Sequence, residues 1–410
     1  MAQTQLTYVI VKAGETIQSI ATRYKTTATT IARLNGLERE AELSPGMLLQ
    51  VPKPRPEPPP KPTLTMRPRT PRYAFAVYTG QEGIYPGSEK ALLRHGEEHL
   101  TGIFPLWFQC APNEPWRLQS FVDDETIKKT VAHAHDRRVQ VFATLSNRYY
   151  RGDLDGSEVA RQAMTRYREA LLERLARTYR YYQLDGLHLD WVELYREDRE
   201  RFIQWVTVLS SFCKREGLKL VVNVPILPDE AGKALCPMDL KRIGEQVDLI
   251  SLMLNTEHRM HTTPGPLSSM KWTENGVRLA LAKGAPAHKL LLGLAGYAYD
   301  WKAWSQVPEY LSCEGAINRA RQYRATIQFD QESQTPMFPY TDTNGVKHEV
   351  WFENSSSLSQ KLTVVNHYDL AGIALWRLGM EDGGLWPLLQ ARWNAIRKWE
   401  SGLRNIFYDK

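Results

Sequence analysis

The sequence predicts an α/β chain: a (β/α)8 barrel with an α+β insertion between strands 7 and 8, preceded by a small βααβ domain on a proline-rich linker. Three observations predict this. Eight short β-rich runs alternate with longer helical patterns in the large C-terminal part. The N-terminal part carries its own strand–helix–helix–strand pattern. A proline-dense stretch separates the two. The expected boundaries are 1–52, 53–71 and 72–410.

The N-terminal pattern occupies residues 6–52. Residues 6–11 read as a strand, and Thr16 is placed to cap a helix whose apolar residues recur at helical spacing. A second helix is expected to stop at Asn35-Gly36, because glycine accepts the left-handed conformation that ends many helices. A turn at 44–46 precedes the closing strand. These elements predict a small independent unit.

The unit contains four characteristic pieces: Val9-x-Val11-x-x-Gly14-Glu15-Thr16, Ile20-Ala21, Asn35-Gly36-Leu37 and Leu43-x-Pro45-Gly46-x-x-Leu49-x-Val51-Pro52. Together they resemble the LysM domain over its whole length. LysM domains bind glycans that contain N-acetylglucosamine, so the resemblance implies a shallow groove between loops 13–16 and 44–47. The glycan-binding residues it implies are Gly14, Glu15, Thr16, Pro45 and Gly46. The alternative is that the two glycines serve only as turn residues.

The linker, 53–71, is rich in proline. Proline fixes φ and removes an amide donor, so this stretch is expected to be an extended, semi-rigid spacer. A glycan-binding domain on such a tether raises the local concentration of the body near its glycan.

The barrel pattern follows. Helical patterns lie between several of the strands, for example at 157–182 and 198–216, and the insertion is expected at about 301–352. The eight expected strands are 73–78, 102–108, 140–145, 186–192, 219–224, 249–254, 289–294 and 372–376.

The fourth strand carries the run on which the functional prediction depends. Residues 184–193 read Leu-Asp-Gly-Leu-His-Leu-Asp-Trp-Val-Glu. Side chains of a strand alternate between its two faces, so His188, Asp190 and Val192 are expected to share the inward face. Glu193 is expected to point to the other face.

This run resembles the fourth-strand signature of family 18 glycoside hydrolases, Asp-Gly-x-Asp-x-Asp-x-Glu. Asp185, Gly186 and Asp190 match it, whereas His188 and Val192 stand where two acidic residues would be, and Glu193 comes one residue late. Further stretches look like the LysM-bearing, spore-cortex lytic branch of that family. They are residues 247–258, 264–266, 291–301, 348–353 and 372–379.

The resemblance implies a substrate-assisted reaction, in which the N-acetyl oxygen of the substrate attacks the anomeric carbon. The fourth-strand Glu would protonate the leaving oxygen, but that position is Val192. Asp190 keeps the role of orienting the acetamido group, and the helper tyrosine of the sixth strand has become Asn255. The other positions implied to bind substrate are Met253, Asp185, Tyr297 and Trp376, the last as the floor of the sugar subsite. A positioned acid is typically worth roughly 10²- to 10⁴-fold in rate.

Three interpretations therefore compete. The barrel has lost hydrolysis and kept binding of peptidoglycan or chitin-like glycan; or a bulge at the strand end brings Glu193 into the vacant place as proton donor. In the third, His188 beside Asp190, or Glu257 of a later loop, acts as acid or base. A lone histidine inside a barrel is more often a packing residue, and the changes at Asn255 and Thr256 count against retained activity.

The composition and the N-terminal residues indicate which classes of binding partner and which location to expect. The net charge of +6 suits an anionic wall polymer as well as an ordinary mixed surface, and basic residues are not interleaved with aromatics as in a nucleic-acid groove. The four scattered cysteines predict neither disulfides nor a zinc site. We expect no cofactor, metal, nucleic acid or membrane partner. The start, Met-Ala-Gln-Thr-Gln, lacks the features of a signal peptide, so we expect synthesis in the cytoplasm and deposition at the spore cortex, coat or cell wall.

Overall fold

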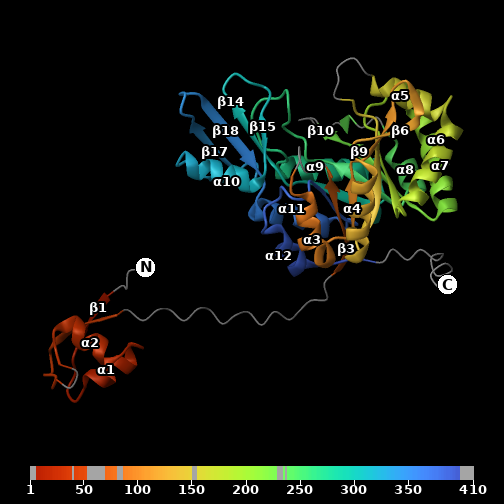
Figure 1. The fold of residues 1–410 in the computed structure, drawn as a ribbon. Coiled ribbons are helices and arrows are strands. Elements are labelled where there is room, and N and C mark those ends of the chain that lie inside the picture. Colours follow the sequence, from red (N-terminus) through yellow and green to blue (C-terminus); the bar gives the residue numbers. More distant parts are fainter. Residues whose placement is uncertain are drawn as a thin grey trace, which may run out of the picture. The chain divides into compact units, whose positions relative to one another are not determined.

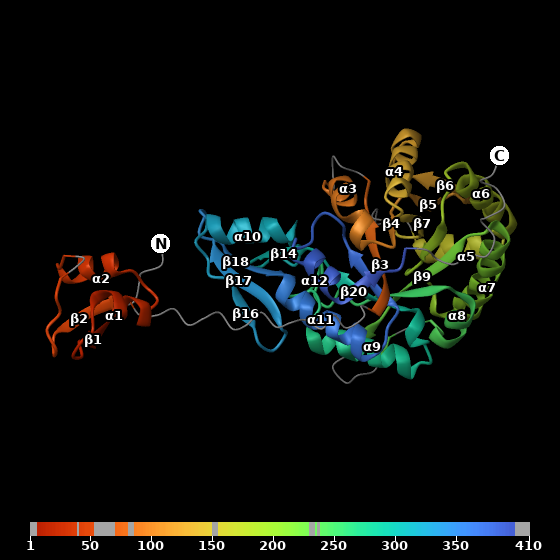
Figure 2. The same ribbon diagram turned by 90° about the horizontal axis from the view of Figure 1, so that it is seen from below.

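The computed structural model describes residues 6–38, 41–52, 70–80, 86–149, 155–228, 234–235 and 238–397. The chain forms two compact units, Met1–Pro68 and Arg69–Lys410. Figures 1 and 2 show both units in two views. The proline-rich spacer lies outside the described residues up to position 69, and the first barrel strand already begins at Thr70, inside the predicted linker.

The N-terminal unit has the predicted order of strand, two helices and strand. Thr16 caps the first helix through the backbone amide of Ser19, and Gly36, with φ of 65°, ends the second helix in the left-handed conformation. The two strands pair antiparallel, and their inward side chains pack on both helices. The elements are β1 (Leu6–Ile10), α1 (Ile17–Arg23), α2 (Ala28–Asn35) and β2 (Leu48–Pro52).

The large unit is a closed barrel of eight parallel strands, in which each strand pairs with the next and the last pairs with the first. All eight predicted strands are confirmed. The strands are β3 (Thr70–Tyr78), β4 (Gly102–Pro105), β7 (Gln140–Ser146), β8 (Gly186–Asp190), β9 (Lys219–Pro225), β12 (Leu249–Met253), β13 (Leu290–Ala295) and β19 (Gly372–Trp376).

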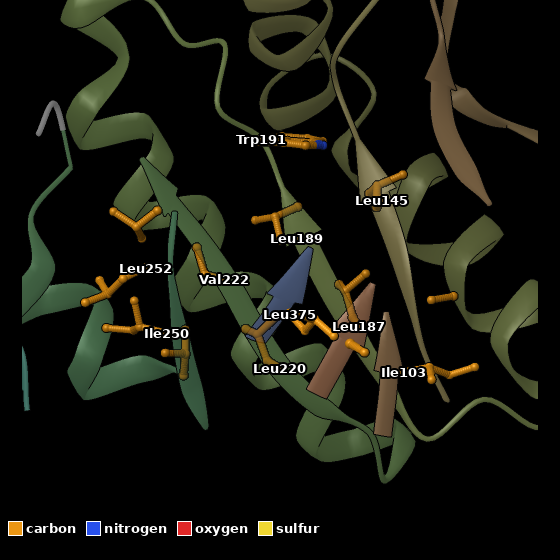
Figure 3. Close-up of a cluster of buried hydrophobic side chains, with 14 of the residues drawn as sticks. Ile103, Leu145, Leu187, Leu189, Trp191, Leu220, Val222, Ile250, Leu252 and Leu375 are labelled. Atoms are coloured by element: carbon orange, nitrogen blue, oxygen red, sulfur yellow. The ribbon is translucent and has the colours of Figure 1, made fainter. Parts of the chain in front are cut away.

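Side chains alternate strictly along these strands. On β8, Leu187 and Leu189 face the surrounding helices, and Trp191, just past the strand end, continues the alternation by stacking on Trp205 at 5.6 Å. Figure 3 shows this outer layer. His188 and Asp190 therefore point inward. Burial of the outer layer fixes the register of each strand, because a slip of one residue would turn every apolar side chain around.

Helices surround the barrel in both views of Figures 1 and 2. The predicted helix at 157–182 is two helices, α5 and α6. The helical elements of this layer are α3 (Ser88–His99), α4 (Asp124–Asp136), α5 (Gly156–Met164), α6 (Arg168–Tyr181), η1 (Arg196–Asp198), α7 (Arg199–Glu216), α8 (Leu240–Gln246), α9 (Met270–Ala282), η2 (Ala287–Lys289), α11 (Ser355–His367) and α12 (Leu385–Arg392).

Short strands accompany the barrel. β5 (Phe108–Ala111) and β6 (Glu114–Ser120) form a hairpin beside β7, and β10 (Leu227–Pro228) pairs with β11 (Ala234–Leu235). β20 (Trp393–Ala395) pairs with the start of β3. The start of the C-terminal tail, at 393–395, thus completes a ladder on the barrel.

The predicted insertion between strands 7 and 8 is an antiparallel sheet of five strands with one helix. It begins at Ala298, three residues earlier than predicted, and ends at Phe352. Ala316 and Ala320 of the helix pack on one face of the sheet. The elements are β14 (Ala298–Lys302), β15 (Glu309–Leu311), α10 (Cys313–Gln322), β16 (Gln328–Asp330), β17 (Thr335–Thr341) and β18 (Lys347–Phe352).

Candidate functional site

The candidate site lies at the carboxyl ends of the barrel strands, where inward-facing polar side chains meet. The amide of Asn223, on β9, donates to the carboxylate of Asp190 at 2.6 Å and lies 4.0 Å from the sulfur of Met253. The guanidinium of Arg148, which follows β7, reaches the same sulfur at 3.6 Å. The mouth therefore holds one carboxylate, one amide and one guanidinium within a few ångströms of Met253.

The sequence did not single out Asn223 or Arg148. The signal for Asn223 was available, since a polar residue on the inward face near the end of a buried strand is unusual. Arg148 lies beyond the end of its strand, where alternation no longer predicts direction, so only the folded chain shows its position.

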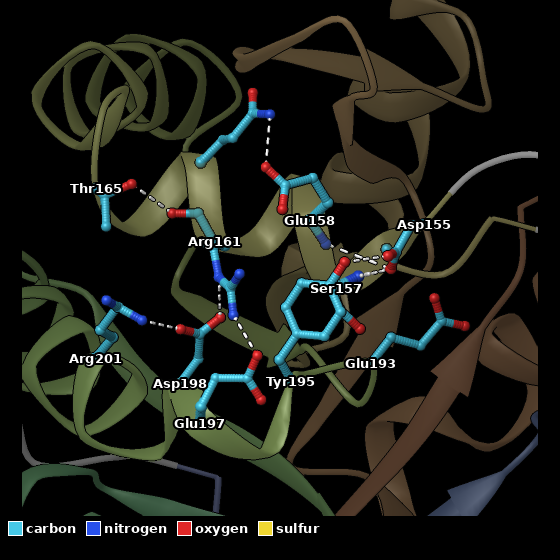
Figure 4. Close-up of polar contacts among 12 residues, drawn as sticks. Asp155, Ser157, Glu158, Arg161, Thr165, Glu193, Tyr195, Glu197, Asp198 and Arg201 are labelled. Atoms are coloured by element: carbon cyan, nitrogen blue, oxygen red, sulfur yellow. Dashed lines mark hydrogen bonds and ion pairs between the residues drawn. The ribbon is translucent and has the colours of Figure 1, made fainter.

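The strand that carries the predicted site ends at Asp190, two residues earlier than expected. Glu193 therefore lies in the following loop. Its backbone carbonyl accepts from the side-chain amide of Asn147 at 2.5 Å, and its carboxylate lies against Gly156 at the start of α5. A Cβ on Gly156 would stand 2.2 Å from that carboxylate, so only glycine permits this approach. Figure 4 shows Glu193 near Asp155 at this end of the helix.

The electrostatics of Glu193 reflect this position. Burial raises the pKa of the Glu193 carboxyl, and the charges of Asp155 and Asp190 raise it further, whereas Arg148 and the Gly156 amide act in the opposite direction. In the described part of the chain no hydrogen bond joins Glu193 to Asp190, whose carboxylate accepts from Asn223. The two carboxylates thus influence each other only through space.

His188 is built into the barrel interior. Its ring stacks on Phe104 at 4.1 Å between centroids, and its Nδ1 lies 3.0 Å from the hydroxyl of Thr144. The side chain is buried, and burial lowers the pKa of His188 to about 4. The imidazole is therefore neutral near pH 7. Glu257, the other candidate of the third interpretation, is bound by the backbone amide and hydroxyl of Ser269.

The aromatic side of the mouth is formed by Trp376 at the end of β19. Its indole N–H donates to the hydroxyl of Tyr310 at 3.1 Å, which connects the mouth to the inserted sheet. Tyr297 packs in the same cluster, and its hydroxyl donates to the backbone carbonyl of Asn255 at 2.9 Å. Tyr297 and Asn255 are both buried. Tyr297 thus supports the residues of the mouth through this hydrogen bond and does not present a free hydroxyl to substrate.

Asp185, expected to bind substrate, lies at the opposite end of the barrel. It precedes β8, and its carboxylate accepts from the backbone amide of Val141 and pairs with His135, both at 2.8 Å. Parallel strands present their amino ends at one face of a barrel and their carboxyl ends at the other. The assignment of Asp185 to the substrate site is therefore corrected: its contacts fasten α4 and β7 to the start of β8.

In the N-terminal unit, the two predicted glycan-binding loops lie side by side, because Val11 exchanges backbone hydrogen bonds with Gly46 and Met47. Gly14 and Gly46 have φ of 80° and 90°, where other residues are strained. Both glycines and Pro45 are exposed.

Two predicted contact side chains of these loops already have partners inside the unit. The carboxylate of Glu15 pairs with Arg23, and the hydroxyl of Thr16 caps α1.

Metal-ligating side chains, cysteines and apolar helices are considered in turn for the described residues. Across the described ranges, no group of three or more His, Cys, Asp or Glu side chains is arranged to hold a metal ion. Cys110, Cys213 and Cys313 are buried free thiols, and Cys236 lies outside the described residues. In the same residues, no helix is long and apolar enough to cross a membrane.

A closed barrel with polar residues at its mouth is a fold shared by many glycoside hydrolases, and a small strand–helix–helix–strand unit precedes it here. Residues 122–381, more than half of the chain, match the glycosyl hydrolases family 18, and residues 9–52 match the LysM domain. The chain belongs to family 18.

Comparisons with individual proteins agree. The chain is 27% identical to the putative sporulation-specific glycosylase YdhD of Bacillus subtilis, covering 95% of this chain and 99% of that protein. It is 30% identical to the cortical fragment-lytic enzyme of B. subtilis, over 56% of this chain and 54% of that enzyme.

Solved structures share the fold. The spore cortex-lytic enzyme SleL of Bacillus megaterium superposes with a TM-score of 0.72 at 23% identity, covering 96% of this chain and 87% of that one. The structure of YdhD gives a TM-score of 0.60 at 27% identity, covering 67% and 90%.

Proposed function

We propose that this protein binds N-acetylglucosamine-containing glycan of the peptidoglycan or chitin type through both of its units, and that its barrel is impaired in hydrolysis. The observation that carries the proposal is the residue at the position of the acid. Val192 has no proton to give, and the neighbouring carboxylate of Glu193 lies against Gly156 and is not hydrogen-bonded to Asp190 in the described residues.

Other features support binding. Trp376 offers an aromatic face at the mouth, suited to the apolar face of a sugar ring. Asp190 has an amide partner that fixes its orientation toward a ligand. The exposed, paired loops of the LysM domain supply a second site on the same chain, so that binding to a polymer is strengthened by avidity.

The names of its relatives suggest where the protein works. YdhD is described as sporulation-specific, and two further relatives are named as a cortical fragment-lytic enzyme and a spore cortex-lytic enzyme. We accordingly infer deposition at the spore cortex, coat or cell wall.

One observation favours a second function, an active N-acetylglucosaminidase that uses Glu193. Burial raises the pKa of Glu193, as expected of a general acid, and Asp190 is close enough to contribute. In this alternative the loop after β8 rearranges when substrate binds and releases the carboxylate from Gly156.

One experiment separates the two. Purified full-length protein is incubated with cortex fragments and with N-acetylglucosamine oligomers, and both sedimentation with the glycan and release of reducing ends are measured. The proposal expects binding without release, and binding unchanged in Glu193→Gln. Turnover that disappears in Glu193→Gln supports the alternative. Turnover that survives Glu193→Gln but is lost in His188→Ala points to the third interpretation.

The matched gain-of-function variant is Val192→Glu, which returns a carboxyl group to the vacant position. If only the acid is missing, this variant should raise release of reducing ends by roughly 10²- to 10⁴-fold. If Asn255 in place of the helper tyrosine is also limiting, the gain will be smaller and will increase when Asn255→Tyr is added.

A further inference from the structure

The inserted sheet carries a cavity of about 430 Å³ that is separate from the residues of the barrel mouth described above. It lies on the face opposite α10, where Trp301, Lys347 and Glu349 project. The loop 262–264 and the turn 303–306 form its walls, and the backbone amide of His261 joins these walls by donating to the carbonyl of Gln306 at 2.7 Å. This hydrogen bond fixes the loop 262–264 and the turn 303–306 relative to each other, so the walls of the cavity are preformed.

Trp304 stands on this turn with its side chain fully exposed, at 104% of the reference surface. Its φ is 68°, a left-handed conformation that a bulky residue rarely adopts. A large indole in water is unfavourable for the isolated protein, and aromatic faces of this kind stack on sugar rings.

Two lysines, Lys302 and Lys347, line the same cavity. The backbone of Ala303 hydrogen-bonds to Lys347, which keeps both lysines near the turn. Neither lysine forms an ion pair in the described part of the chain. The one carboxylate among the lining residues, Glu349, already accepts from the indole of Trp351 at 2.6 Å. Lys347 projects on the cavity side of the sheet, whereas Lys302, which pairs with His348, starts from the other face and lines the cavity at its edge.

The floor of the cavity also contains a hydrogen-bond donor without an acceptor. Trp301 is buried, lines the cavity, and its indole N–H has no acceptor among the described residues. Buried donors are nearly always paired with protein, water or ligand.

A continuous row of aromatic contacts connects this floor with the barrel mouth. Trp301 contacts Tyr299 at 5.2 Å, Tyr299 contacts Tyr310 at 5.7 Å, and Tyr310 accepts from Trp376. Trp301 is buried and the other three rings are partly exposed, so the row packs the floor of the cavity against the mouth.

We propose that this cavity is a second saccharide subsite, in which Trp304 stacks on a sugar ring while Lys302 and Lys347 bind a carboxylate carried by the polymer. The inference rests on the proposed glycan-binding function and adds a chemical preference to it: acidic peptidoglycan strands over neutral N-acetylglucosamine polymer. The carboxylate belongs either to the lactyl group of a muramic acid unit or to an attached stem peptide.

The test compares full-length wild type with Lys302→Gln/Lys347→Gln and with Trp304→Ala. Lys129→Gln/Lys283→Gln, which alters two exposed lysines elsewhere, is the control. Affinity is measured for four soluble probes: neutral N-acetylglucosamine oligomers, peptidoglycan oligomers with stem peptides, the same oligomers after removal of the peptides, and oligomers whose carboxylates have been converted to methylamides. The LysM domain is identical in all variants, so differences between them report on the insertion.

Two exposed ion pairs predict that Lys302→Gln/Lys347→Gln weakens binding of the acidic oligomers by about 2- to 30-fold, with the neutral and methylamidated probes unaffected. The loss should shrink at high salt. Trp304→Ala should weaken binding of all four probes. In the peptide-bearing oligomers the lactyl carboxyl is tied up in the amide bond to the peptide, so a lysine effect on these oligomers that disappears after removal of the peptides identifies a stem-peptide carboxylate. A lysine effect that appears only after removal identifies the lactyl carboxylate.

Equal binding of acidic and neutral probes by wild type, or an equal loss in the control variant, overturns this proposal and leaves glycan binding intact. If wild type binds none of the probes, the proposed function itself is refuted.

Discussion

The role of His188 can be decided by the pH dependence of stability. If the ring is a buried packing residue, it is neutral in the folded chain and must stay so as the pH falls. Burial lowers the pKa of His188 from 6.5 to about 4. Between these values the unfolded chain binds a proton that the folded chain does not, so stability falls as the pH is lowered through this window. Above pH 6.5 the residue contributes no pH dependence.

The size of the effect follows from the two values. Each pKa unit corresponds to about 1.4 kcal/mol, so the full difference is on the order of 3 kcal/mol below pH 4. At pH 5, where most unfolded chains but few folded chains are protonated at this site, the loss relative to pH 7 is about 2 kcal/mol.

Urea unfolding followed by tryptophan fluorescence measures this loss in the barrel alone, because all 12 tryptophans lie beyond residue 106. The variant His188→Gln removes the titrating ring. It should be less stable than wild type at pH 7, since the stacking on Phe104 is lost, but its stability should fall by about 2 kcal/mol less between pH 7 and pH 5. The variant His367→Gln, on an exposed helix face, should follow the wild-type curve.

Parallel pH profiles for wild type and His188→Gln would refute the reasoning. They would mean that the imidazole is protonated in the folded barrel, and a charged His188 beside Asp190 would return the third interpretation, acid–base chemistry, to consideration.

Three further changes have definite expected outcomes. Gly156→Ala places a Cβ 2.2 Å from the carboxylate of Glu193 and should cost about 1–3 kcal/mol in urea unfolding. Lys361→Met leaves the buried carboxylate of Glu353 without its cation and should cost about 3–5 kcal/mol, much of it regained in the double variant Lys361→Met/Glu353→Leu. Asn35→Ala removes two hydrogen bonds that join α2 to Gln50 of β2 and a third to Ile31 within α2, and should lower protection of residues 6–52 in hydrogen exchange by about 2 kcal/mol.

Matched variants keep these outcomes interpretable. Gly383→Ala has no neighbour within 4 Å of the new Cβ and should be nearly neutral, so an equal cost at both glycines would contradict the steric argument. A double variant no more stable than Lys361→Met alone would contradict the unpaired-charge argument. For the LysM domain, exposed Gln18→Ala is the comparison, and unchanged exchange in Asn35→Ala would show that the three bonds are dispensable.

The sequence predicted the features that depend on local order. Helix caps, a glycine at a helix end and the alternation of apolar residues depend on residues close together in the sequence. The predicted bounds of the LysM elements and of the eight strands therefore differ from the observed bounds by only a few residues. The assignment of Val192 to the position of the acid stays a prediction, because β8 already ends at Asp190 and counting along the strand stops there.

Only the tertiary structure decided where side chains go once a strand has ended. Glu193 lies against Gly156 at the start of α5, and Asp185 is bound by His135 at the far end of the barrel. Neither partner is predictable from spacing, because such contacts join segments tens of residues apart. The alternation along a strand determines the direction of each side chain only as long as the strand is paired. Beyond the strand end, packing between distant segments determines which residues come into contact.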